Sequence, residues 1–69
     1  MKEEKILELK KADLISQINE VQGSLNNSYN NMQIACNSHL LDYYAYKIKA
    51  EEALHEFLIE QYKKLNSSS

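Results

Sequence analysis

The tetrapeptide CNSH at residues 36–39 separates two long segments, each of which has apolar residues at helical spacing. Asn37 suits the end of the first segment, because asparagine adopts the left-handed conformation that often closes a helix. Ser38 suits the N-cap of the second segment, and Asp42 would then lie in the first turn, near the positive end of the helix dipole. We therefore predict a turn at residues 36–39 between two helices.

The segment before the turn carries a single apolar face. Its apolar residues recur every three or four positions, as on one side of an α-helix, and Glu3 and Glu4 lie near its positive end. The polar run QGSLNNSYNN, residues 22–31, lowers helix propensity by about 3 kcal/mol, but the apolar spacing continues through it. We predict one helix over residues 3–35, with a loop around residues 26–31 as the alternative. The predicted face consists of Leu7, Leu14, Ile18, Val21, Leu25, Met32 and Ala35, with Lys11 and Ser28 in its polar gaps.

The segment after the turn predicts a second helix of similar length. We place this helix over residues 39–65, with Lys63 and Lys64 at its negative end and a frayed tail at residues 66–69. A short link between two helices of similar length implies that they run antiparallel. The predicted fold is all-α: a single domain over residues 1–69, formed by an antiparallel two-helix hairpin.

The second helix is apolar on two sides. Side chains three or four positions apart share a helix face and adjacent ones do not, so Tyr43, Tyr44 and Tyr46 cannot all contact the first helix. We expect a broad face to pack against the first helix, and it consists of Leu40, Leu41, Tyr44, Ile48, Leu54, Leu58, Tyr62 and Leu65. The other apolar residues form a second stripe, which consists of Tyr43, Tyr46, Ala50, Ala53 and Phe57.

The second stripe predicts a protein interface. Its alanines allow another helix to approach closely, and its tyrosines combine an apolar ring with a polar hydroxyl. An exposed apolar patch of this kind is rare on a monomer. We therefore expect a non-catalytic interaction module that forms a symmetric homodimer, arranged as a four-helix bundle with the second stripe at its interface. The alternatives are binding of another helical protein and scattered exposed tyrosines without a role.

Three polar residues, Lys47, Glu51 and His55, interrupt the broad face of the second helix. We expect them at the margin of that face, with Lys47 and Glu51 paired at a spacing of four residues. The alternative is a buried polar layer that sets the register of the two helices.

The composition predicts a soluble cytoplasmic protein without nucleic-acid or membrane partners. The 69 residues have a formal net charge of −2 and no arginine, and the lysines are dispersed among glutamates. No basic surface therefore favours nucleic acid or anionic lipid. No apolar run approaches the ~18 residues of a membrane span, and no signal peptide is recognisable. The single cysteine excludes an internal disulfide, so a core this small favours oligomerisation.

No group of residues predicts catalysis or a cofactor. Cys36 and His39 form half of a zinc-binding pattern, but structural zinc uses four ligands and only His55 remains to join them. A nucleophilic Cys36 would need a shaped pocket and an oriented base, which two helices do not provide. We therefore expect no enzyme activity, no metal and no cofactor.

Three short runs of the second helix carry a resemblance to a known family. They are LLDYY at residues 40–44, YKIKA at residues 46–50 and EFLI at residues 56–59. In these runs the chain resembles the YaaL-like family of small helical proteins from Firmicutes, although His55 stands where an aromatic residue is usual there. That family has no established activity, so the resemblance implies a bacterial cytoplasmic helical protein and assigns no site.

The run SHLLD at residues 38–42 has the spacing Ser-x-x-Leu-Asp. In this run the chain resembles the helical-hairpin phosphatases that act on sporulation response regulators, which implies roles for Ser38 and Asp42 in dephosphorylation. His39 stands where that family has an amide, and the predicted helix continues far beyond Asp42. Phosphatase activity is therefore the alternative function, and helix capping by the same two residues explains the run structurally.

Overall fold

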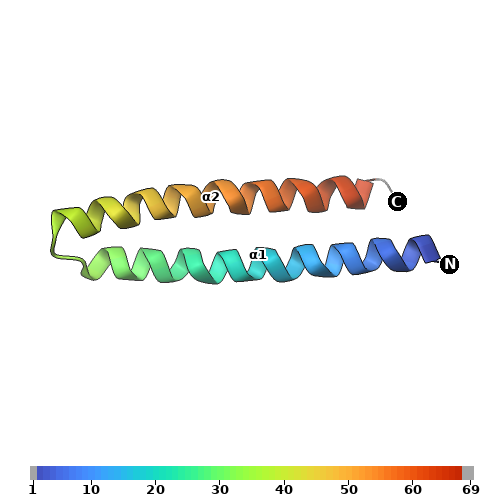
Figure 1. Ribbon diagram of the computed structural model, residues 1–69, viewed down its shortest axis with the longest axis horizontal. Helices are drawn as coiled ribbons and strands as arrows, with labels where there is room; N and C mark the ends of the chain where they lie inside the picture. Colours follow the sequence, from blue (N-terminus) through green and yellow to red (C-terminus); the bar gives the residue numbers. More distant parts are fainter. Residues whose placement is uncertain (1, 68–69) are drawn as a thin grey trace.

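The described part of the chain, residues 2–67, is an antiparallel hairpin of two helices in the computed structural model. Helix α1 spans Lys2–Ile34 and helix α2 spans Ser38–Ser67. The hairpin measures 55 × 14 × 11 Å, and its helices lie side by side along its length (Figure 1). The predicted all-α hairpin is therefore confirmed.

Helix α1 continues without a break through the polar run at residues 22–31 and ends one residue before the predicted end. Gly23 has no positive φ, and a β-carbon added to it would meet no atom within 4 Å, so neither a turn nor a close approach requires a glycine there. Ser24, Leu25 and Ser28 of the same run are partly or fully buried in the hairpin. Packing against α2 therefore offsets the low helix propensity of the run.

The turn differs from the prediction in its capping residue. The Oδ1 atom of Asn37 accepts a hydrogen bond from the backbone N–H of His39 at 2.8 Å. The carbonyl oxygen of Asn37 accepts another from the N–H of Leu41 at 3.0 Å. Asn37 is therefore the N-cap of α2, and Ser38 is the first helical residue. The predictions of a Ser38 cap and a left-handed Asn37 are wrong, since no non-glycine residue in the described part has positive φ.

Both ends of α2 also differ from the prediction. Because the helix begins one residue early, its first turn holds no acidic residue, and Asp42 follows that turn. At the other end the helix continues to Ser67, whose hydroxyl donates a hydrogen bond to the carbonyl oxygen of Lys64 at 3.1 Å. Asn66 and Ser67 therefore belong to α2 rather than to a tail, and the rest of the predicted tail, residues 68–69, lies outside the described residues.

The core is a narrow seam between the two helices. On α2 the apolar side chains of Ile48 and Leu58 are buried, with exposed fractions of 7% and 4%. On the α1 side every residue of the predicted apolar face is partly buried, which means Leu7, Leu14, Ile18, Val21, Leu25, Met32 and Ala35.

The face that α2 turns toward α1 is rotated from the predicted broad face. Leu40, Leu41 and Leu54 are 48%, 38% and 47% exposed, so their predicted place in the core is wrong. Glu51 and His55 are instead partly buried. Two packed helices bury only a narrow stripe of each other, at alternating spacings of three and four residues. On α2 this seam consists of Tyr44, Ile48, Glu51, His55, Leu58, Tyr62 and Leu65.

Candidate functional site

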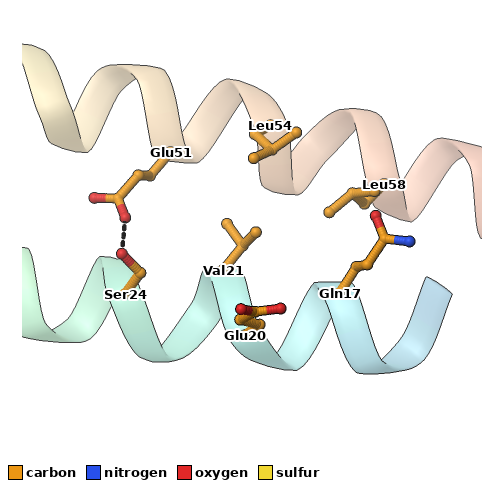
Figure 2. A pocket seen from close by; sticks show the side chains of 7 residues that line it. All are labelled: Gln17, Glu20, Val21, Ser24, Glu51, Leu54 and Leu58. Atoms are coloured by element: carbon orange, nitrogen blue, oxygen red, sulfur yellow. Dashed lines mark hydrogen bonds between the residues drawn. The ribbon is translucent and has the colours of Figure 1, made fainter. Parts of the chain in front are cut away.

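A polar layer crosses the seam and consists of Ser24 and Ser28 of α1 with Lys47 and Glu51 of α2. Ser28 is 1% exposed, and its hydroxyl donates a hydrogen bond to Oε1 of Glu51 at 2.7 Å. The same hydroxyl accepts a hydrogen bond from Nζ of Lys47 at 3.2 Å. The hydroxyl of Ser24 donates a hydrogen bond to Oε2 of Glu51 (Figure 2). Nζ of Lys47 lies 3.5 Å from Oε1 of Glu51 and completes the layer.

The two helices each contribute a pair of residues one turn apart to this layer. In the described part of the chain, every buried side-chain nitrogen or oxygen has a hydrogen-bond partner. The expected marginal position is correct for Lys47, whose side chain is 37% exposed, and wrong for Glu51, whose side chain is 14% exposed. It is also wrong for His55, which is partly buried in the seam. The structure therefore shows the alternative, a polar layer within the seam. In the observed alignment of the helices, the carboxylate of Glu51 lies between Ser24 and Ser28, so both serine hydroxyls contact it.

Hydrogen bonding holds the pKa of Glu51 below its ordinary value. The bond from Ser24 is the largest cause, partial burial acts in the opposite direction, and the bond from Ser28 and the charge of Lys47 lower the pKa further. The ionised carboxylate is therefore the form that the hairpin stabilises. Its two oxygens contact Ser24, Ser28 and Lys47, which fits a structural role in joining the two helices.

A second link between the helices joins Tyr29 and Glu52. The hydroxyl of Tyr29 donates a hydrogen bond to Oε2 of Glu52 at 3.3 Å. The pKa of Tyr29 is raised by partial burial first, and then by the charge of Glu52 and this hydrogen bond. The link is exposed, so we expect it to contribute little to the stability of the hairpin.

An open groove runs along the hairpin beside the polar layer. In Figure 2, Leu54 and Leu58 of α2 lie across from Val21 and Gln17 of α1. A second hollow shares Gln17 and Leu58 and continues toward Phe57. The groove wall combines the apolar side chains of Val21, Leu54 and Leu58 with polar ones, which are Gln17, Glu20, Ser24 and Glu51.

The five residues of the second stripe are all exposed on α2. Tyr43, Tyr46 and Phe57 are 55%, 76% and 54% exposed. Ala50 and Ala53 are exposed as well. The hairpin therefore leaves this apolar surface of α2 uncovered by α1.

Leu54 belongs to the same uncovered surface, although the sequence predicts it on the broad face. It lies four residues after Ala50 and three before Phe57, so it shares their side of the helix. This spacing is the signal that could have identified it. Its exposed fraction of 47% and its place in the groove wall confirm that its side chain stands at the edge of the seam.

The residues considered for chemistry do not come together. Cys36 is exposed and its Sγ lies 3.6 Å from the carbonyl oxygen of Ile34, while His55 is partly buried in the seam. Among residues 2–67, no three histidine, cysteine, aspartate or glutamate side chains are grouped so as to hold a metal ion. Ser38 and Asp42 are exposed at the start of α2. In the described part, no side-chain hydrogen bond or ion pair joins Ser38 or Asp42 to another residue.

The fold and these surfaces define the class: a small helical-hairpin protein with a polar layer in its seam and an uncovered apolar stripe. The model of the family described as protein of unknown function (DUF2508) matches residues 1–69, and the chain belongs to this family. No curated protein and no solved structure significantly matches the chain. In the described part, neither helix has an apolar stretch that is long enough to cross a membrane.

Proposed function

We propose that the protein is a non-catalytic interaction module that binds another helix through the second stripe of α2. The observation that carries this proposal is the exposure of Tyr43, Tyr46 and Phe57 on α2, with the small residues Ala50 and Ala53 between them. Aromatic side chains contribute much of the energy of protein interfaces, and small residues allow two helices to approach.

The shape of the hairpin supports this proposal. Its accessible surface is 5574 Å², whereas a compact monomer of this size would expose about 4,450 Å². Its radius of gyration is 16.0 Å, compared with about 11 Å for a compact domain of this length. Only Ile48 and Leu58 among the described apolar residues are buried. Covering the second stripe would add the apolar burial that the isolated hairpin lacks.

We also propose that the chain is a YaaL-like protein of Firmicutes and that it is located in the bacterial cytoplasm. The support for this assignment is the match of residues 40–44, 46–50 and 56–59 to the runs of that family.

A concentration series tests the proposal. Molar mass would be measured by light scattering and helix content by circular dichroism on the same samples. A helical dimer supports binding through self-association, and a poorly helical monomer that gains helix with a partner supports binding to another protein. A fully helical monomer at all concentrations, with no partner captured from the source cell through the second stripe, would contradict the proposal.

A further inference from the structure

We propose that the helix bound by this surface is α2 of a second copy of the chain, running antiparallel about a two-fold axis at Ala50. The inference rests on the proposed function, because it names the partner for the same exposed surface. The observations that carry it are the symmetry of the exposed residues about Ala50 and the area that the hairpin leaves uncovered.

Apart from Ala53, the exposed apolar residues of this surface are arranged symmetrically along α2. Tyr43 and Phe57 lie seven residues to either side of Ala50, and Tyr46 and Leu54 lie four residues to either side. At ~100° per residue, these five side chains fall within about 80° of the helix circumference. We call Tyr43, Tyr46, Ala50, Leu54 and Phe57 the symmetric set.

A two-fold axis at Ala50 makes the symmetric set complementary to itself. Tyr43 of each copy then meets Phe57 of the other, and Tyr46 meets Leu54. The two Ala50 residues meet at the crossing point, where small side chains let the helix backbones approach closely. A two-fold interface uses the same patch on both copies, so the symmetric spacing has a direct use in this arrangement. A parallel pair of α2 helices, or a pair with an unrelated helix, would not require this symmetric spacing.

The exposed fractions agree with this arrangement. All four large members of the symmetric set are exposed, from 47% at Leu54 to 76% at Tyr46. The accessible surface exceeds that of a compact monomer by about 1,100 Å². A stable interface of standard size covers about 800 Å² on each partner. The hairpin therefore leaves enough surface uncovered for one such interface.

Site-specific crosslinking tests the orientation. In a Cys36→Ser background, Tyr43→Cys and Phe57→Cys would be oxidised separately and as an equimolar mixture. The antiparallel pair predicts a disulfide-linked heterodimer in the mixture and no crosslink in either variant alone. Ala50→Cys is expected to crosslink to itself. As a control, Ala45→Cys mixed with Glu56→Cys should remain uncrosslinked, because both positions are exposed on the opposite side of α2.

The molar mass of each variant, together with its crosslinking pattern, distinguishes failure of this inference from failure of the proposed function. A dimer in which Tyr43→Cys crosslinks to itself is parallel and would overturn the inference while leaving the proposed function intact. A dimer that crosslinks only through the control pair would overturn both, because it uses another surface. A monomer at every concentration would overturn the inference, and the proposed function would then depend on whether a different partner induces helix.

Discussion

The hydroxyl of Ser28, which is 1% exposed, lies 2.7 Å from Oε1 of Glu51 on the opposite helix. This contact places a charged residue at a seam position where a leucine would ordinarily pack. Ser24 and Lys47 satisfy the rest of the carboxylate, so the charge is stabilised within the seam. The hairpin therefore holds an ionised side chain in its seam, and its apolar core is correspondingly smaller.

Removal of the Glu51 carboxylate should destabilise the hairpin. Glu51→Ala leaves the buried Ser28 hydroxyl without its acceptor, and the expected loss is about 1–3 kcal/mol in the free energy of unfolding. Urea denaturation followed by circular dichroism at neutral pH would measure it. Glu56→Ala is the matched control, since it removes an exposed glutamate from the same helix and should change stability by less than about 0.5 kcal/mol. Equal losses of unfolding free energy in Glu51→Ala and Glu56→Ala would argue against a stabilising contribution from the polar layer.

The contribution of Glu51 should depend on pH. Because its folded-state pKa lies below the ordinary value of 4.5, its stabilisation is present above pH 4.5 and is lost as the pH falls through the folded-state pKa. The difference in unfolding free energy between the wild-type chain and Glu51→Gln should therefore shrink under acid conditions. Urea denaturation of both chains from pH 6 down to pH 3 would measure this difference. If this difference in unfolding free energy stayed constant over the pH range, the charge of Glu51 would not contribute to stability.

Gly23→Ala should stabilise the chain by about 1 kcal/mol. Alanine has a higher helix propensity than glycine, and a β-carbon at this position meets no atom within 4 Å. Thermal denaturation at fixed protein concentration would detect the expected rise in Tm. An unchanged Tm would indicate that α1 is frayed around residue 23 in solution.

Asn37→Ala should lower the free energy of unfolding by about 1 kcal/mol, because the side chain of Asn37 caps α2 by accepting a hydrogen bond from the His39 N–H. Ser38→Ala should have little effect, since Ser38 is the first helical residue and not the cap. Parallel urea titrations of the two variants would compare them. A larger loss of unfolding free energy in Ser38→Ala than in Asn37→Ala would show that Ser38 is the cap.

Charges placed on the second stripe should dissociate the proposed dimer. Tyr46→Glu and Ala50→Glu would each bury an unpaired carboxylate in the interface, and a shift from dimer to monomer is expected in light scattering. Lys49→Glu is the control, because it introduces the same residue at an exposed position between them. A dimer that survives both stripe variants and dissociates with Lys49→Glu would place the interface on another side of α2.

The sequence by itself determined the hairpin, the apolar face of α1 and the stripe of α2 that points away from α1. These features follow from local spacing, because residues three or four apart share a helix face whatever the helix packs against. The continuity of α1 through the polar run at residues 22–31 could also be read from that spacing.

Only the tertiary structure decided which residues of α2 enter the seam and which residue caps the turn. From apolarity alone, the broad face was predicted to be centred on the leucines, with Glu51 at its margin. The hydroxyls of Ser24 and Ser28 satisfy that carboxylate from the opposite helix, so Glu51 enters the seam and Leu54 moves to its edge. Asn37 and Ser38 are both good N-caps, and the choice between them depended on where the chain reverses. The choice of the seam residues depends on the partner helix across the hairpin, and one segment cannot reveal its partner.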